Sequence, residues 1–478
     1  MRRAGLAIVI VLIVLILLIA LTPILSARFN WEFMRPTMNA PLPKWNPEYG
    51  YRFANLPPSV AGSSDSLFIV ASFSGGGARA SALSYGVLKE LSRTPIVWEG
   101  YRKTLADELN IINALSGGSF TAAYYALRHD RIFQDFESRF LRKNWERELR
   151  ARILRSPINW VRLLSPYYGR SHIMADLLNE ALFEGATFSD LLSSEQRPLI
   201  YLHASDMATL SRFEFNQRQF DLICSDLSKL PLAVATAASS ALPLILSPIS
   251  LKNYAGQCGL DPPTYLNESK RTSWWGHRRV SELRSYTDAE RRPYIHLLDG
   301  GLADNLGMRY ILEFAALLDD LDSTFQTLGV RRVRKLVFLM VSAETDPDLS
   351  SFKLDELPSL ARVLNALVDI PINRYSDDTV VLMSQAVTQW RAQLLKRART
   401  GDTVFTSDAD IYLINASLSE LEDAEERARL MSIPTNLSLT DAQVDDLLQA
   451  GSKLIRNDKE FQRLLGDLGA EAGKTAVQ

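Results

Sequence analysis

A serine and an aspartate, each followed by glycines, are the residues of this chain best suited to chemistry. Ser116 lies in "INALSGGSFTAAYYAL", between an apolar run and a segment with helical spacing. Its neighbours Ala114, Gly117 and Gly118 are small, as in the G-x-S-x-G nucleophile elbow, where a sharp turn lifts a serine out of a sheet. Ala114 stands where that motif usually has glycine. The pattern predicts a nucleophilic serine on a strand-to-helix turn; a turn rich in small residues and without chemistry is the alternative.

A serine hydroxyl is a weak nucleophile and requires a base. Asp299 ends the apolar run "PYIHLLDGG" and is therefore placed to meet Ser116 at the end of a neighbouring strand. Asp304 is the rival carboxylate, although it is better suited to cap a helix. Of the five histidines, only His277 and His296 come late enough in the chain for a triad in the order Ser, acid, His. His296 lies in an apolar run typical of a buried core histidine, and His277 lies in a polar, arginine-rich loop.

Three consecutive glycines, Gly75, Gly76 and Gly77, follow the apolar run "LFIVASF". A P-loop requires Gly-Lys-Ser/Thr at this point, but Ala78, Arg79 and Ala80 follow the glycines. A dinucleotide fingerprint requires a G-x-G-x-x-G spacing, which is not present because no further glycine occurs until Gly86. Exposed amides at the start of a helix can stabilise an anion, and a tight turn is the alternative. A carboxylate is a poorer base than imidazole at neutral pH, so a Ser–Asp pair depends on such oxyanion donors, each worth about 3–4 kcal/mol.

Strands alternating with helices are expected to position these residues. Continuous apolar runs separated by helical spacing are typical of an α/β fold with a largely parallel sheet. The five runs are "LFIVASF", "ELNIINALS", "PLIYLHAS", "PYIHLLDGG" and "RKLVFLMVSAE". We expect an anchor over residues 1–27, an extended spacer over 28–62, an α/β domain over 63–346, and a mostly helical C-terminal region over 347–478.

The N-terminus carries the strongest hydrophobic signal. No charge occurs from Ala4 to Ala27, and the run from Ala4 to Leu21 is eighteen apolar residues long. A helix of about 20 residues crosses a bilayer core, which predicts a transmembrane anchor. Arg2 and Arg3 favour a cytoplasmic N-terminus, with the main domain on the opposite, periplasmic or extracytoplasmic side. Secretion after signal cleavage is the alternative, but the apolar run is longer than that of a typical signal peptide.

Composition bounds the remaining possibilities. The chain has 478 residues, of which 47% are hydrophobic and 23% charged, as in a globular protein that buries a core. Its net charge of −2 gives no basic field that would indicate nucleic acid as a partner. The two cysteines, Cys224 and Cys258, are too few for a disulfide scaffold or a cysteine-rich metal site. They can pair with each other or remain buried thiols. Nothing in the sequence indicates the oligomeric state.

Two basic segments have a possible role at a membrane. Residues 137–155 place arginines opposite an apolar helical face formed by Leu141, Trp145, Leu149 and Ile153. Such a helix can lie on an anionic membrane, or its apolar face can pack on the domain core, which is the better-supported interpretation. Residues 269–280 combine two tryptophans with lysine and arginines, as at a membrane interface or in an ordinary surface loop.

Four motifs together resemble the patatin-like phospholipase family. They occur in the order of that family and extend the resemblance over about residues 65–345. The motifs are "GGGAR" (Gly75–Arg79), "ALSGG" (Ala114–Gly118), "ASSALP" (Ala238–Pro243) and "DGG" (Asp299–Gly301). Two positions depart from the family pattern: Ala114 replaces the first glycine of the elbow, and Ala80 stands where another glycine is common.

The resemblance implies a three-layer α/β/α fold and hydrolysis of the acyl esters of membrane lipids, without a metal or cofactor. It implies that Ser116 is the nucleophile and Asp299 its base. The oxyanion hole would be formed around Gly75, Gly76, Gly77 and Arg79. Two alternatives remain open: a Ser-His-Asp carboxylesterase, and a lipid-binding or scaffold protein on the same fold.

Overall fold

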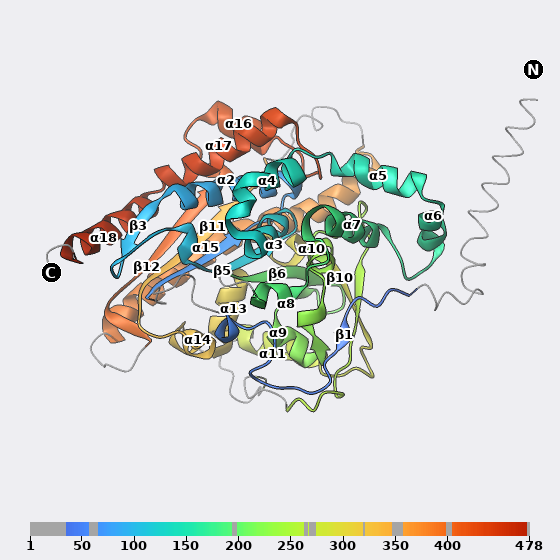
Figure 1. Ribbon diagram of the computed structural model, residues 1–478, viewed down its shortest axis with the longest axis horizontal. Coiled ribbons are helices and arrows are strands. Elements are labelled where there is room, and N and C mark those ends of the chain that lie inside the picture. The colour runs from blue at the N-terminus through green and yellow to red at the C-terminus, as the bar shows by residue number, and fades with distance from the viewer. Residues whose placement is uncertain are drawn as a thin grey trace, which may run out of the picture.

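The computed structural model describes residues 35–56, 66–193, 198–261, 266, 274–318, 321–346, 357–397 and 404–475 (Figure 1). The anchor predicted over residues 1–27 lies outside these ranges. Within them, no helix combines the length and the apolar character needed to cross a membrane.

A mixed sheet of eight strands forms the centre of the molecule (Figure 1). Its order is β12-β11-β2-β5-β6-β10-β9, and β7 pairs with β6. The strands are β2 (Leu67–Phe73), β5 (Leu109–Leu115), β6 (Leu199–Asp206), β7 (Ser211–Phe215), β9 (Ile249–Lys252), β10 (Tyr294–Asp299), β11 (Val333–Ser342) and β12 (Phe405–Ser417). All five predicted apolar runs form strands. The five strands from β12 to β6 are parallel, whereas β7, β9 and β10 pair antiparallel with their neighbours.

Helices cover both faces of this sheet, which explains why its central strands are apolar throughout. Every residue of β2 and β5 is buried. On one face, Phe68 contacts Phe325, and Phe338 contacts Trp390. On the other face, Phe73 lies directly against Gly118. Because successive side chains of a strand point to opposite faces, both faces are packed.

Most of the helices lie between the strands along the chain, and α16, α17 and α18 follow the last strand. They are α2 (Gly77–Arg93), α3 (Gly117–Arg128), α4 (Ile132–Phe136), α5 (Trp145–Arg155), α6 (Pro157–Leu164), α7 (Arg170–Leu178), α8 (Phe188–Ser193), α9 (Gln217–Leu222), α10 (Leu232–Ser239), α11 (Trp274–Ser285), α12 (Gly301–Asp304), α13 (Arg309–Leu318), α14 (Leu321–Leu328), α15 (Leu360–Arg397), α16 (Ala424–Met431), α17 (Asp441–Asn457) and α18 (Lys459–Thr475). Phe325 therefore belongs to α14 and Trp390 to α15, and Gly118 belongs to α3.

Strands β5 and β10 approach each other end to end along one edge of β6. A strand has two edges, and β7 occupies one edge of β6 over residues 202–206. The other edge pairs with β5 as far as His203 and with β10 from Ala204 onward. Strand β5 ends at Leu115, opposite His203, and β10 ends at Asp299, opposite Ala204. The antiparallel direction of β10, which the sequence analysis did not predict, therefore brings Asp299 to the level of Ser116.

The C-terminal region contains a strand as well as the predicted helices. Strand β12 pairs in parallel with β11 over most of its length and forms an edge of the central sheet. Helix α17 packs against α2, since Gly86 of α2 lies against the backbone of Leu448. The boundary predicted at residues 346 and 347 therefore does not separate the C-terminal region from the sheet, which β12 completes.

The predicted spacer lies against the domain over its described part, residues 35–56. Strand β1 (Ala40–Pro41) pairs with β8 (Ser225–Asp226), and Tyr51 is fully buried in the core. Cys224 and Cys258 form a disulfide with a Cα–Cα distance of 5.5 Å. The amides of Leu42 and Trp45 donate to the carbonyls of Cys224 and Cys258, respectively. The segment that follows the predicted anchor is therefore hydrogen-bonded to the backbone of both disulfide-linked cysteines.

The basic segment 137–155 is broken into two helices instead of forming one. A π-helical turn covers Glu137–Leu141, and α5 begins at Trp145, where the side chain of Asn144 accepts a hydrogen bond from the amide of Arg147. Leu141, Trp145 and Leu149 are buried, so the apolar face packs on the core, as the better-supported interpretation held.

Candidate active site

Ser116 lies at the sharp turn between β5 and α3. Its backbone angles, φ 46° and ψ −124°, fall in a region that residues other than glycine rarely adopt. The two following residues must be glycine for reasons of space. A Cβ on Gly117 would overlap the carbonyl of Gly77, and a Cβ on Gly118 would lie 2.5 Å from the carbonyl oxygen of Phe73. The turn therefore has the geometry predicted from its small residues.

Ala114 is accommodated without strain. It lies inside β5, is fully buried, and is not among the residues with positive φ. The departure from glycine at this position therefore leaves the turn at Ser116 intact.

The side chains of Ser116 and Asp299 are hydrogen-bonded. Ser116 Oγ donates to Asp299 Oδ2 at 2.7 Å, and the amide of Gly301 donates to Asp299 Oδ1 at 2.8 Å. Both side chains are buried, and burial raises the pKa of Asp299 to about 6, against the opposing effect of these two hydrogen bonds. The carboxylate is thus a stronger base than an exposed aspartate, while it remains largely ionised at neutral pH.

Ser239, in the "ASSALP" motif, joins the serine turn to the aspartate turn. Its carbonyl accepts from the amides of Ser116 at 3.2 Å and Gly300 at 2.9 Å. Its hydroxyl accepts from the Ser116 amide at 2.8 Å and donates to the carbonyl of His203 at 2.7 Å. The motif was recognisable in the sequence, but Ser239 was not predicted as a site residue, because its contacts are mainly to the backbone.

The glycine loop lies beside Ser116. A Cβ on Gly75 would lie 3.4 Å from Ser116 Cβ. Gly76 and Gly77 have φ of 132° and 60°, which favour glycine. The Gly75 amide donates to the carbonyl of Asn305 at 3.2 Å. Within the described residues, the amides of Gly76 and Gly77 have no such acceptor, so two donors at the start of α2 are available to an anion.

Arg79 makes its hydrogen bonds away from Ser116, although it was predicted with the oxyanion hole. Its guanidinium is buried and donates to the carbonyl of Ala343 through Nε at 3.0 Å and Nη2 at 2.8 Å. It also donates to the carbonyl of Ile433 and to Thr435 Oγ1. Arg79 therefore connects the start of α2 to the residue after β11 and to the segment after α16. Through these contacts it fixes the position of the glycine loop.

Asp304, the rival carboxylate, caps a helix. It accepts hydrogen bonds from the amides of Gly307 and Arg309, both at 3.0 Å, at the start of α13. It is fully buried, which raises its pKa to about 6, and Arg212 lies 3.6 Å away and opposes this rise. These contacts agree with the capping role expected from the sequence.

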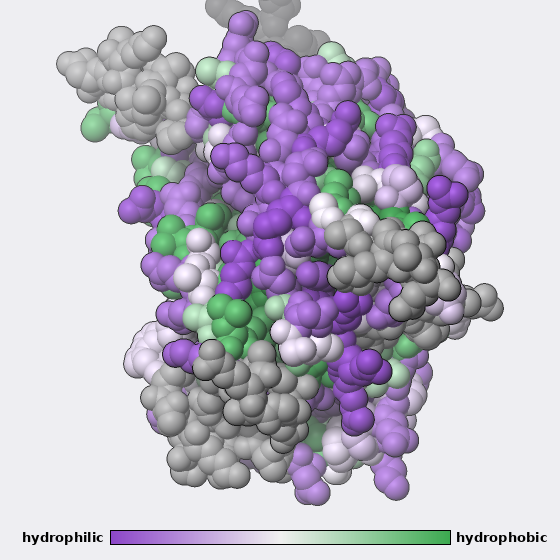
Figure 2. Space-filling model, turned by 90° about the vertical axis from the view of Figure 1, so that its left-hand side faces the viewer, coloured by the Kyte–Doolittle hydropathy of each residue, from purple (hydrophilic) through white to green (hydrophobic). Residues whose placement is uncertain are grey.

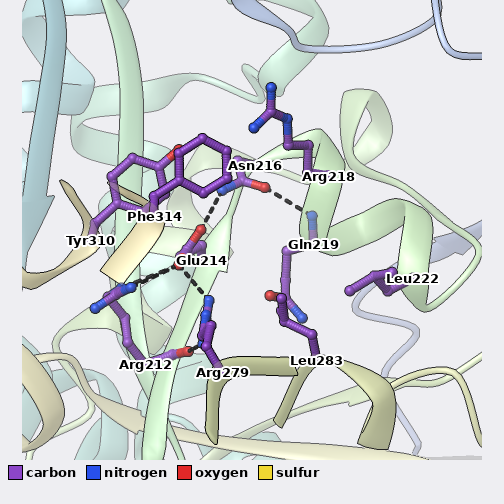
Figure 3. A pocket seen from close by; sticks show the side chains of 10 residues that line it. All are labelled: Arg212, Glu214, Asn216, Arg218, Gln219, Leu222, Arg279, Leu283, Tyr310 and Phe314. Atoms are coloured by element: carbon purple, nitrogen blue, oxygen red, sulfur yellow. Dashed lines mark hydrogen bonds and ion pairs between the residues drawn. The ribbon is translucent and has the colours of Figure 1, made fainter. Parts of the chain in front are cut away.

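A network of buried charges holds Arg212 in place (Figure 3). Arg212 and Arg279 converge on the carboxylate of Glu214, with distances of 3.1 Å and 2.6 Å. The adjoining cavity has a volume of only about 30 Å³, which suits a water molecule and excludes a lipid. We therefore interpret this network as a support for the loop between β10 and α13.

A larger cavity of about 530 Å³ is lined by Leu298, the residue before Asp299, although neither Asp299 nor Ser116 is among its lining residues. Ser205 lines it, and the Ser205 hydroxyl donates to the Asp299 carbonyl at 2.7 Å. Leu298, Leu302 and Trp274 contribute apolar surface. This volume is within the range of sites that hold small ligands.

The two histidines considered as alternative bases, His277 and His296, are exposed on the surface. His296 is exposed on β10, and its Nδ1 lies 2.7 Å from Ser250 Oγ, so the expectation of a buried core histidine was wrong. His277 is exposed on α11. The hydrogen-bond partner of the Ser116 hydroxyl is Asp299.

Helix α15 covers the aspartate turn. Asn305 Nδ2 donates to Ser376 Oγ at 3.2 Å, and Arg309 Nε donates to Thr379 Oγ1 at 2.9 Å. A Cβ on Gly301 would lie 3.6 Å from Ile372 Cδ1. The C-terminal region therefore contributes to the surroundings of the site, which its sequence did not indicate.

Comparisons with solved structures give weak similarities. Human GIVD cytosolic phospholipase A2 shares 13% identity at a TM-score of 0.37, covering 85% of this chain and 63% of that one. The same enzyme in complex with methyl gamma-linolenyl fluorophosphonate shares 12% identity at a TM-score of 0.38, covering 85% of this chain and 59% of that one. VipD from Legionella pneumophila shares 11% identity at a TM-score of 0.26, covering 90% of this chain and 72% of that one. The chain thus spans less than two thirds of the human enzyme. No curated protein matches it in sequence.

The comparison with family models gives the decisive match. The model for patatin-like phospholipases matches residues 71–312, which is 242 of the 478 residues. The matched range contains the glycine loop, the Ser116 turn, Ser239 and the Asp299 turn. This chain belongs to the patatin-like phospholipase family.

Proposed function

We propose that this protein is a membrane-anchored serine acyl hydrolase that cleaves fatty-acyl esters of phospholipids or related lipids. The hydrogen bond of 2.7 Å between Ser116 Oγ and Asp299 Oδ2 carries the proposal. Membership of the family supports lipid acyl hydrolysis in general. The dyad, the anchor and the substrate class are the specific parts of the proposal.

Acylation begins when Asp299 accepts the hydroxyl proton of Ser116 and the serine oxygen attacks the ester carbonyl. The tetrahedral intermediate places a negative charge on the former carbonyl oxygen. The amides of Gly76 and Gly77, at the positive end of α2, donate to this oxyanion. As the intermediate collapses, the ester C–O bond breaks, and Asp299 returns its proton to the leaving lysolipid or glycerol oxygen.

Deacylation repeats these steps with water. Asp299 removes a proton from a water molecule, which attacks the acyl-serine carbonyl and forms a second oxyanion. Collapse of this intermediate releases the fatty acid and restores the Ser116 hydroxyl with the proton held by Asp299. The raised pKa of Asp299, about 6, suits a group that must accept and return a proton in each step.

We further propose that the catalytic domain lies on the extracytoplasmic side of the membrane that holds the N-terminal anchor. The uncharged stretch from Ala4 to Ala27 and the preceding arginines support this orientation. The Cys224–Cys258 disulfide also supports it, since disulfides persist mainly in oxidising compartments.

A fluorophosphonate probe tests the dyad in the detergent-solubilised full chain. Wild-type protein is expected to become labelled, Ser116→Ala to lose labelling, and Asp299→Asn to retain only a small fraction of the labelling rate. Hydrolysis of a lipid ester and of a short soluble ester is measured on the same preparations. His277→Gln and His296→Gln are the controls and should retain activity.

Folded wild-type protein without labelling or turnover would favour the lipid-binding or scaffold alternative. Loss of activity in either histidine variant, with Asp299→Asn still active, would instead favour a Ser-His-Asp esterase.

A further inference from the structure

Helices α5 and α6 carry an apolar surface that no described part of the chain covers. Five large side chains on this surface have exposed fractions between 42% and 69%. They are Leu154 at the end of α5, then Ile158, Trp160, Val161 and Leu164 on α6. Exposed apolar side chains are common singly, but a contiguous group marks an interaction surface. We call these two helices the arm.

The arm is held firmly at its base. Trp145 and Leu149 of α5 are buried in the core, and Arg152 Nη1 donates to Glu180 Oε1 at 3.0 Å. Asn159 Nδ2 donates to the carbonyl of Arg152 at 3.2 Å. The apolar side chains are therefore displayed by a fixed element.

Beyond Glu148 in the first turn of α5, the charges of the arm are all positive. No aspartate or glutamate occurs between Glu148 and Asp176, and this stretch contains five arginines. They are Arg150, Arg152, Arg155, Arg162 and Arg170. Arginine beside tryptophan and leucine is the composition of segments that lie in the headgroup region of an anionic membrane.

The arm lies where the chain enters the described structure. The guanidinium of Arg35, the first described residue, lies 4.3 Å from the ring centroid of Tyr167. Tyr167 follows the last residue of α6 by only three positions. In Figure 1, α6 and the start of the described chain lie on the same side of the molecule. Arg35 is eight positions after Ala27, so the two residues are at most about 28 Å apart, which places the arm in the neighbourhood of the predicted anchor.

The opposite end of the molecule has a different character. Figure 2 shows the side that carries α18 and β3 (Pro95–Trp98), where hydrophilic residues predominate over most of the coloured surface and the apolar ones are scattered. The side drawn in Figure 2 is therefore poorly suited to contact lipid.

We propose that the arm is a membrane-docking element: Leu154, Ile158, Trp160, Val161 and Leu164 enter the headgroup region of an anionic bilayer, the one that holds the N-terminal anchor, while the exposed Arg155 and Arg162 bind lipid phosphates. The inference rests on the anchor in the proposed function. Docking holds the catalytic domain in one orientation on the surface that contains its substrate.

A depth measurement in proteoliposomes tests this inference directly. Both native cysteines are in the disulfide, so a single new cysteine accepts a thiol-reactive fluorophore. Ile158→Cys is labelled in the full chain and reconstituted with phosphatidylcholine and phosphatidylglycerol. Lipids with a spin label near the headgroup are expected to quench this probe strongly. The control is Tyr101→Cys, at an exposed aromatic position on β4 (Tyr101–Thr104), which pairs with β3; this probe should not be quenched.

Equal, weak quenching at both positions would overturn the inference. So would a probe at position 158 that is shielded from water but not quenched by lipid, because a second copy of the chain would then cover the arm. Quenching does not require turnover, so the result stands whether or not the protein hydrolyses lipid.

An activity comparison gives an independent result. Trp160→Asp is expected to reduce hydrolysis of lipid in anionic vesicles about tenfold, because it removes buried apolar area and places a carboxylate near lipid phosphates. Hydrolysis of a short soluble ester should remain unchanged. Equal activity of variant and wild type on vesicles would contradict the docking role. A wild type inactive on both substrates would contradict the proposed function and leave the quenching result valid.

Discussion

The backbone of Ser116 is held in an unfavourable conformation by contacts to three other motifs. The Ser239 carbonyl and hydroxyl accept from its amide, Gly117 lies against Gly77, and Asp299 accepts from its hydroxyl. Strain of this kind costs about 1–3 kcal/mol and persists only where the surroundings fix it. We infer that these motifs, which are up to 222 positions apart in the chain (Gly77 to Asp299), act as one unit.

The dyad leads to a prediction about pH. Burial raises the pKa of Asp299 from 3.8 to about 6, so below pH 6 the base becomes protonated and cannot accept the serine proton. We expect kcat/KM for a soluble ester to fall about tenfold per pH unit below that point. The folded state binds this proton more tightly than the unfolded chain does, so through this group acidification from about 6 to 3.8 favours folding.

Activity and thermal unfolding, measured together from pH 4 to 8, separate the two effects. Activity should decline near pH 6 before the protein unfolds. An inflection near pH 7 that shifts in a histidine variant would contradict the assignment of the base.

Two adjacent serines give a matched test of the "ASSALP" motif. Ser239→Ala removes the hydroxyl that links the Ser116 amide to the His203 carbonyl, whereas Ser240→Ala removes a hydroxyl that donates to Thr236 at 2.8 Å. Both hydroxyls are buried, so each variant should lose about 1–3 kcal/mol of stability. Only Ser239→Ala should also lower kcat, by about tenfold. Equal kcat values in the two variants would show that Ser239 does not position the nucleophile.

At the scale of elements, the sequence predicted the strands better than their arrangement. The five apolar runs were recognisable because a strand covered on both faces requires apolar residues at every position. Strand β12 was missed because its first half, "FTSDAD", is polar and partly exposed at the sheet edge. The direction of β10 could not be predicted, since it depends on pairing with β6 and β9.

The site also contains residues that could be identified from the sequence and residues that could not. Ser116 and Asp299 were identified because the chemistry requires their side chains and the turns require the glycines beside them. Asn305 was not identified, because it acts on the glycine loop through its backbone carbonyl, a group that every residue has. Arg79 has a side chain that suits an anion, but its hydrogen bonds lead to carbonyl groups on β11 and after α16.

Helix α15 should influence catalysis through Asn305. Ser376→Ala removes the hydroxyl that accepts from Asn305 Nδ2 and leaves a buried donor without this partner. Because the Asn305 carbonyl accepts from the amide of Gly75, we expect kcat on a soluble ester to fall about 3- to 10-fold. The control is Thr388→Ala, an exposed position on the same helix whose hydroxyl donates to the carbonyl of Ser384. Equal effects of the two substitutions on kcat would show that α15 does not act on the site through Asn305.

At the scale of the whole molecule, the chain is organised around one sheet with contributions from both of its ends. Strand β12 and helix α17 bring the C-terminal region onto β11 and α2. The segment around Leu42 and Trp45 brings the other end onto the disulfide. Under the proposed function, this contact holds the segment that follows the anchor against the catalytic domain, so the orientation of the domain does not depend on the linker alone.

The disulfide should therefore contribute to global stability. Cys224 and Cys258 are separated by 34 positions, and closing a loop of this length restricts the unfolded chain by roughly 3–4 kcal/mol. We expect a reducing agent to lower the thermal midpoint of the wild type and to leave a Cys224→Ser/Cys258→Ser variant unaffected. The variant without reductant should unfold at the same temperature as the reduced wild type. Rapid reaction of the purified, folded wild type with a thiol reagent before reduction would show that the cysteines are free, and would also remove one support for the extracytoplasmic location.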